Sequence, residues 1–294
     1  MRLPVVVGVD GSESSLRALD WAAAEAARSR RPLRIVHASL WEHYEGLRPP
    51  VDPEHPVEQV LAERLVDSAR NRVRDLRPEV DVVADVQPED PVAALVRESH
   101  EAAVVVLGSR GRGRIAGMIL GSVGLALAGR SHCPAVVIPA RPPHTPAEPG
   151  RVVLGIGDAA EPAPAAVFAL SQAASRHGEL IAVRAWRRPA HALLNRPPLP
   201  GSPAPAHRRE AEEHLETVLV ALTGHDDSGT VVHRSVTQGP THQVLIEAAE
   251  GAELLVVGAR RSSGWHGLQL GPVDHAVLHY APCPVAVVPD TPRS

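Results

Sequence analysis

Short apolar runs rich in valine and isoleucine alternate along the chain with longer segments in which apolar residues recur every three or four positions. The short runs are typical of buried strands and the longer segments of amphipathic helices. In the first half the pattern predicts strands at about 5–9, 33–37, 80–86, 103–107 and 135–138. It predicts helices at about 14–29, 57–76, 91–101 and 122–131. Strands that alternate with helices in this way favour a parallel sheet with helices on both faces.

The second half repeats the pattern of the first. Residues 5–10, 33–37, 104–108 and 133–139 match, in the same order, residues 152–157, 180–184, 254–258 and 283–289. This tandem repeat predicts further helices at about 164–176, 208–222, 241–249 and 273–280. Residues 140–150 carry four prolines. We therefore expect one domain at 1–140, a proline-rich linker at 141–150 and a second domain at 151–290.

The composition is that of a soluble globular protein, with 44% apolar and 22% charged residues among 294. The net charge is −4, so no basic field points to nucleic acid. All 30 basic residues are arginine, which excludes a phosphate-binding lysine, a Schiff-base lysine and a lysine general base. The two cysteines suit a reducing compartment, and neither a signal peptide nor a membrane-spanning run is visible. We expect a cytoplasmic protein that contacts no membrane.

A glycine-rich loop between Gly108 and Ser122 is the main chemical feature of the first half. It follows the apolar run 104–107 and leads into a predicted helix. Glycines permit positive φ and close approach to a ligand, and backbone N–H groups gather at a helix start. The order of strand, loop and helix therefore predicts a cradle for a phosphate group.

The spacing Gly108-x2-Gly111-x9-Gly121-Ser122, together with Asp10-Gly11-Ser12 after the first strand, resembles the universal stress protein family in its tandem, ATP-binding form. The resemblance implies two Rossmann-like α/β domains, each an open, mainly parallel five-stranded sheet with helices on both faces. It also implies ATP with Mg²⁺ as the ligand, Asp10 in contact with the nucleotide, and the backbone near Ala38 beside the adenine. The expected ligand-binding residues are Asp10, Gly11, Ser12, Ala38, Gly108, Arg110, Gly111, Gly113, Gly121, Ser122 and Val123.

Several of these residues have an alternative role. Asp10 is a common type of helix cap, and Arg110, like Arg112 and Arg114, is of a kind often solvated on exposed loops. His37 fits a packed strand end better than a catalytic role. We expect no catalytic residue, since only Asp10 could activate a water molecule.

The second half retains Gly258 and Gly271 of the loop pattern but changes three other positions. Gly157 stands where the first half has Asp10, Arg261 replaces Gly111, and Pro272 replaces Ser122. Proline lacks an N–H donor but fits the first turn of a helix. We therefore expect the second domain to bind ATP weakly or not at all, although Arg260 and Arg261 leave another anionic ligand open.

Two further features bear on ligands and assembly. His275, His279 and Cys283 follow one another at intervals of four, but we expect no metal site because a fourth ligand at fixed spacing is missing. Long loops at 41–56 and 186–206 are either lids or plain surface loops. The family resemblance implies antiparallel pairing of the two fifth strands as an internal pseudo-dimer, with independent domains as the alternative.

The sequence thus predicts an ATP-binding universal stress protein, a nucleotide-sensing or regulatory module in the stress response with at most slow ATP hydrolysis. ATP would be bound chiefly by the first domain. The alternatives are an enzyme that transfers an adenylyl group and a nucleotide-free interaction scaffold. The signalling partner is not identified by the sequence, and association of whole chains into a homodimer is left open.

Overall fold

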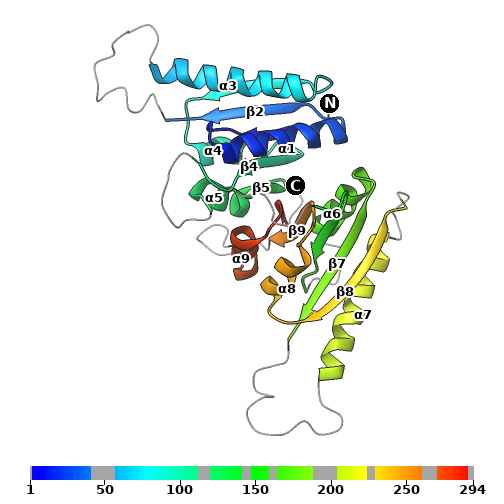
Figure 1. Cartoon of the computed structure of the whole chain (residues 1–294). Helices are drawn as coiled ribbons and strands as arrows, with labels where there is room; N and C mark the ends of the chain where they lie inside the picture. The colour runs from blue at the N-terminus through cyan, green and yellow to red at the C-terminus, as the bar shows by residue number, and fades with distance from the viewer. Residues whose placement is uncertain are drawn as a thin grey trace. The chain divides into compact units, whose positions relative to one another are not determined.

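The computed structural model describes residues 2–40, 57–111, 120–140, 147–158, 164–187, 204–223, 229–259 and 270–290. Among these residues, 2–140 form one compact unit and 147–290 form a second. Both are α/β structures, and each is described here by itself (Figure 1). Of the residues discussed above, Arg112, Gly113, Arg114, Arg260 and Arg261 lie outside the described ranges, as do 41–56 and 188–203 of the two long loops.

The first unit has a parallel five-stranded sheet in the order β3-β2-β1-β4-β5. Its strands are β1 (Val5–Gly8), β2 (Leu33–Ala38), β3 (Val82–Gln87), β4 (Val104–Gly108) and β5 (Ala135–Ile138). Its helices are α1 (Glu13–Ser29), α3 (Val57–Leu76), α4 (Pro91–Glu98) and α5 (Ser122–Arg130). Helix α4 ends at Glu98, earlier than predicted. Beyond it the N–H groups of His100 and Glu101 donate to carbonyls three residues back, at 3.1 and 3.2 Å, so the chain forms tighter turns instead of α-helix.

The second unit repeats this topology in the order β10-β9-β6-β7-β8, again with parallel neighbours. Its strands are β6 (Val152–Gly155), β7 (Glu179–Trp186), β8 (Val231–Gln238), β9 (Leu254–Ala259) and β10 (Val285–Pro289). Its helices are α6 (Pro164–Ser175), α7 (Ala204–Thr223), α8 (Thr241–Ala248) and α9 (Pro272–Tyr280). Helix α7 starts before the predicted residue 208.

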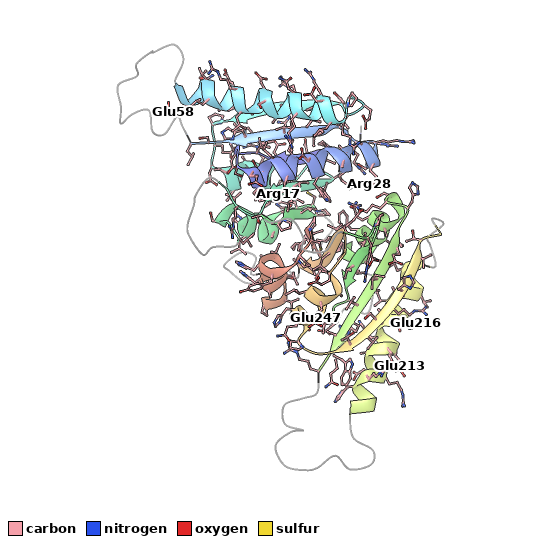
Figure 2. The ribbon with its side chains drawn as sticks, viewed as in Figure 1. Arg17, Arg28, Glu58, Glu213, Glu216 and Glu247 are labelled. Carbon is pink, nitrogen blue, oxygen red and sulfur yellow. The ribbon has the colours of Figure 1, made fainter. Side chains whose placement is uncertain are left out.

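Helices cover both faces of each sheet, as the valine-rich strands predict. In the first unit α1 and α3 pack together on one face, and α4 and α5 pack together on the other. Val5, Val6 and Val7 are fully buried because β1 is central and covered on both sides. Charged side chains such as Glu58 on α3 and Glu216 on α7 lie on the outer helix surfaces (Figure 2).

The strand order places a crevice at the carboxyl ends of β1 and β4. From β1 the chain continues into α1 on one face of the sheet, whereas after β4 it continues toward α5 on the other face. Connections that leave in opposite directions open a crevice between the two strand ends, which is where ligands bind in sheets of this kind. The residues just after β1 and β4 therefore form the candidate site.

Each unit has one buried free cysteine, Cys133 or Cys283. Burial raises the pKa of the Cys133 thiol to about 11 and that of Cys283 to about 12. Within the described ranges, no helix combines the length and apolar character needed to cross a membrane.

Candidate functional site

The turn after β1 is fixed by short-range hydrogen bonds. Asp10 Oδ1 accepts the N–H of Ser12 at 2.9 Å, and Gly11 between them has φ of 80°, a conformation that favours glycine. Ser12, not Asp10, is the N-cap of α1, because its hydroxyl accepts the N–H of Ser15 at 3.2 Å. The half-buried Asp10 carboxylate thus stands at the crevice beside the positive end of α1.

Gly108 is required by packing inside the protein. A Cβ at residue 108 would lie 2.6 Å from the backbone carbon of Ser14 and 2.7 Å from its oxygen, so β4 and α1 approach closely only because this residue is glycine. Its φ is not positive, so the conformational freedom of glycine is not used here. Gly108 was predicted to allow close approach of a ligand, and the structure shows in addition that it allows close approach of the first turn of α1.

The loop after β4 is joined to the turn after β1. The Arg110 N–H donates to Ser14 Oγ at 3.4 Å, and the Arg110 carbonyl accepts from Ser12 Oγ at 3.3 Å. A Cβ at Gly111 would lie 2.7 Å from Asp10 Oδ2, so glycine lets the loop pass the carboxylate; its φ is not positive either. The predicted residues Asp10, Ser12, Arg110 and Gly111 therefore lie in one cluster, with the Arg110 side chain exposed.

The start of α5 provides hydrogen-bond donors, although fewer than predicted. The Gly121 N–H already donates to the Ser109 carbonyl at 2.7 Å. The N–H groups of Ser122 and Val123, in the first turn of α5, have no acceptor among the described residues, and the Ser122 side chain is exposed. A Cβ at Gly121 would meet no atom closer than 3.5 Å. Two backbone donors and a hydroxyl therefore lie beside a position where a side chain would not clash with the described residues.

A buried hydroxyl near this helix start also lacks a partner. Ser109 is 3% exposed, and its Oγ makes no hydrogen bond with the described residues, while its carbonyl holds Gly121. Such unsatisfied buried groups are few in folded proteins and call for an explanation. Its presence beside the α5 start is consistent with a polar site that a ligand completes.

The backbone of Ala38 faces the same crevice. In β2, Val36 accepts from Val9 on the β1 side, whereas Ser39 donates to Gln87 on the β3 side. Because consecutive residues of a parallel strand bond to opposite neighbours, Ala38 has its N–H and C=O on the same side as Val36, which is the β1 side, just beyond the last residue of β1. The buried His37 donates from Nδ1 to the Val9 carbonyl at 2.7 Å, which agrees with its predicted packing role.

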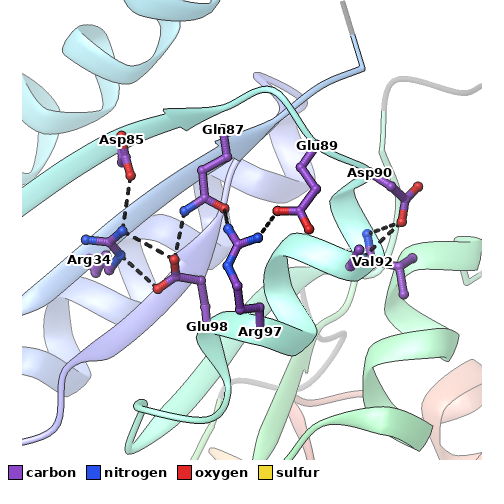
Figure 3. Close-up of polar contacts among 9 residues, drawn as sticks. Arg34, Asp85, Gln87, Glu89, Asp90, Val92, Arg97 and Glu98 are labelled. Atoms are coloured by element: carbon purple, nitrogen blue, oxygen red, sulfur yellow. Dashed lines mark hydrogen bonds and ion pairs between the residues drawn. The ribbon is translucent and has the colours of Figure 1, made fainter. Parts of the chain in front are cut away.

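A polar network holds the neighbouring end of β3 in place (Figure 3). The buried Gln87 side chain donates to Glu98 at 2.7 Å and accepts from Arg97 at 2.9 Å. Glu98 in turn pairs with Arg34 of β2 at 2.8 Å. Since the Gln87 carbonyl also holds Ser39, this network fixes the strand end next to Ala38.

The matching crevice in the second unit is occupied by one of its own side chains. Arg184, at the position of His37, donates to the carbonyls of Ile156 and Gly157 at 3.1 and 2.6 Å. It also pairs with Asp158 at 2.7 Å. His214 of α7 approaches the Gly157 carbonyl at 3.0 Å. The sequence analysis missed this arrangement, although the mismatch of histidine and arginine in the repeat was a visible signal.

Hydroxyls of the first unit are also absent from the second. A Cβ at Gly258 would lie 3.5 Å from the Ala165 side chain, so Ala165 takes the place that Ser14 has against Gly108. The helix start has Pro272, which has no N–H, where the first unit has Ser122. The second crevice thus has fewer donors. In the part of the chain that the structure describes, no three His, Cys, Asp or Glu side chains are grouped to hold a metal ion.

Comparisons with known proteins agree on one family. The Usp family profile (Universal stress protein family) matches residues 1–139 and 149–289. A universal stress protein of Mycobacterium tuberculosis is 32% identical over 99% of this chain and 96% of its own length. The crystal structure of a universal stress protein from Archaeoglobus fulgidus matches with a TM-score of 0.66 at 18% identity, over 98% of each chain. A universal stress protein solved in complex with cAMP is 31% identical over 48% of this chain and 98% of its own, with a TM-score of 0.37.

Proposed function

Because the chain belongs to the universal stress protein family, we propose that its first unit binds ATP in the crevice at the ends of β1 and β4. The observation that carries the proposal is that the N–H groups of Ser122 and Val123 have no acceptor among the described residues, beside Gly121, where an added Cβ would meet none of those residues closer than 3.5 Å. Backbone donors at a helix start, together with the helix dipole, bind phosphate groups. The exposed Arg110 adds a positive charge to the same side of the crevice.

Each part of ATP has a matching group in this crevice. The phosphates would accept from Ser122 and Val123, and the Asp10 carboxylate would hold Mg²⁺ against them, since Mg²⁺ is commonly bound by one carboxylate together with phosphate oxygens. The adenine would lie beside Ala38, whose N–H and C=O can pair with the edge of a base. Gly11, Ser12, Gly108 and Gly111 would shape the turn and loop around the ligand. The predicted Gly113 lies outside the described residues.

The role that fits this site is nucleotide sensing in the cytoplasm. Apart from Asp10, the described crevice offers no side chain suited to activate a water molecule, so turnover would be slow at most. If ATP binds one conformation of the chain more tightly than another, it shifts the population toward that conformation. The surface that a signalling partner or a second copy contacts would then change. The partner would therefore respond to the nucleotide state of the first unit.

Isothermal titration of the full chain with Mg-ATP tests the proposal. We expect one site per chain, loss of binding in Gly121→Val, and nearly unchanged binding in Gly271→Val, the matching change in the second unit. A Cβ at Gly121 would make only an ordinary contact, 3.5 Å from the Ser109 carbonyl oxygen, so the variant should fold while its side chain occupies the proposed place of a phosphate. Two equal sites per chain, or no binding at millimolar ATP, would refute the proposal. The second result would support the nucleotide-free scaffold, and rapid pyrophosphate release in the presence of an acceptor would support the adenylyl-transferring enzyme.

A further inference from the structure

The start of α9 in the second unit carries a buried carboxylate where the first unit has glycine. Counting from the helix starts, Asp274 corresponds to Gly124. Asp274 is 7% exposed, and its Oδ2 accepts the N–H of Gly271 at 3.1 Å. In the first unit the matching N–H of Gly121 instead donates to the carbonyl of Ser109. The donor at the helix start is therefore paired with a carbonyl in one unit and with a negative charge in the other.

A second carboxylate lies near the same end of β9. A Cβ at Gly258 would lie 3.6 Å from Asp290 Oδ1 and a Cβ at Gly271 would lie 3.3 Å from Asp274 Oδ2. Burial raises the pKa of Asp274 to about 6, the neighbouring Asp290 also raises it, and the Gly271 N–H and His275 lower it. At neutral pH the second unit thus holds a negative charge beside the start of α9, whereas at the start of α5 the N–H groups of Ser122 and Val123 have no acceptor among the described residues.

We propose that Asp274 acts as an internal anion at the start of α9, next to the place that corresponds to the proposed phosphate position in the first unit, and so determines that nucleotide binds to the first unit alone. The inference rests on the proposed function. Its physical basis is that like charges a few ångströms apart repel strongly in a partly buried site. Pro272 removes an N–H donor, and the Arg184 side chain takes up space in the second crevice. Asp274 differs from both because its negative charge repels the phosphate itself.

Transfer of the carboxylate into the first unit is the sharper test. Gly124→Asp introduces the charge at the matching helix position, and Gly124→Ala is its control. Both variants place a Cβ 3.1 Å from the side-chain end of Leu120, and aspartate adds a carboxylate beyond it, so circular dichroism of both variants first establishes that they fold. By titration with Mg-ATP we expect Gly124→Ala to bind within about threefold of the wild type and Gly124→Asp to bind at least about thirtyfold more weakly. Equal affinities for the two variants would overturn the proposal.

Removal of the carboxylate from the second unit tests whether the Asp274 charge repels an anion, with inorganic triphosphate in place of ATP. In a Gly121→Val background, inorganic triphosphate is titrated into the parent, Asp274→Gly and Asp274→Asn. We expect Asp274→Gly to bind triphosphate at least about tenfold more tightly than the parent. Asp274→Asn should fall between them, because the amide oxygen still accepts the Gly271 N–H but carries no charge.

No gain in either variant would overturn the role of Asp274. Circular dichroism of both variants establishes that they fold, and the asparagine variant retains the helix cap if the glycine variant does not. If wild-type protein takes up no ATP, the proposed function fails, while the triphosphate comparison still decides whether Asp274 repels an anion.

Discussion

Substitution of Gly108 by alanine should destabilise the first unit severely, whereas the matching change in the second unit should not. The added methyl group at residue 108 would lie 2.3 Å from Ser14 Oγ, 2.6 Å from its backbone carbon and 2.7 Å from its oxygen. A hydroxyl can rotate away, but the backbone of a helix cannot. Helix α1 must therefore withdraw from β4, and the hydrogen bond from the Arg110 N–H to Ser14 Oγ is lost with it.

The expected cost of this change is about 3 kcal/mol, the upper part of the usual range for overpacking a filled core. Gly258→Ala provides the matched control. Its methyl group would lie 3.5 Å from the Ala165 side chain and 3.6 Å from Asp290 Oδ1, which are ordinary contacts. We expect this variant to stay within about 0.5 kcal/mol of the wild type.

Hydrogen exchange of the full chain, followed peptide by peptide, separates the two units in one experiment. A loss of about 3 kcal/mol corresponds to about a hundredfold faster exchange in peptides from β1 and β4, where exchange proceeds through opening of the unit. Peptides from β6 and β9 should be unaffected in Gly108→Ala. Affinity for ATP should fall as well, because the withdrawal of α1 moves Ser12 and Arg110.

The reasoning is refuted if β1 and β4 exchange as slowly in Gly108→Ala as in the wild type. It is refuted equally if Gly258→Ala loosens the second unit by a similar factor. The first result would mean that α1 yields without cost, and the second that glycine is needed for the fold of both units alike.

Three further changes test other contacts. Gly111→Ala places a methyl group 2.7 Å from Asp10 Oδ2 on an exposed loop, so ATP affinity should fall about tenfold in titration while urea denaturation is unchanged. Burial raises the pKa of Asp274 from 3.8 to about 6. Between these two pH values the carboxyl group is protonated in the folded chain but ionised in the unfolded chain. The stability of the wild type relative to Asp274→Asn should therefore fall by about 3 kcal/mol in all as pH rises from about 3 to about 7 and stay level above that, as measured by urea denaturation at each pH. Glu98→Ala removes the acceptor of the Gln87 side-chain N–H and leaves Arg34 with Asp85 alone, so it should cost about 2 kcal/mol in urea denaturation, whereas Glu101→Ala, on the exposed turn after α4, should be neutral.

The fold was predictable because the same order of strand and helix patterns occurs in both halves of the sequence. Strands buried on both faces are almost purely apolar, and each is followed by a helix with a clear apolar face, so types and order are unambiguous. Helix 57–76 was predicted to its ends because it has clear periodicity over its length. The predicted end of α4 was wrong because the chain after Glu98 continues in tighter turns, with bonds to carbonyls three residues back, and a helical pattern of apolar residues does not reveal this change.

The sequence predicted part of the set of residues that lie together at the candidate site, but it did not predict the contacts that make those residue types necessary. Asp10 and Gly111 do lie together, but Gly108 is glycine because of Ser14, a residue more than ninety positions earlier in the chain. Likewise the N–H of Gly121 is taken by Ser109, and Arg184 fills the second crevice. Contacts between residues far apart in the sequence depend on the folded chain, and local patterns do not specify them.

The two buried cysteines make the chain convenient to label. With thiol pKa values of about 11 and about 12, Cys133 and Cys283 are almost entirely protonated at neutral pH and react slowly with maleimides. Cysteines introduced at exposed positions, one on each unit, would therefore carry a pair of fluorophores without removal of the native residues. Energy transfer between such dyes would report directly how the two halves of the chain respond when ATP is added.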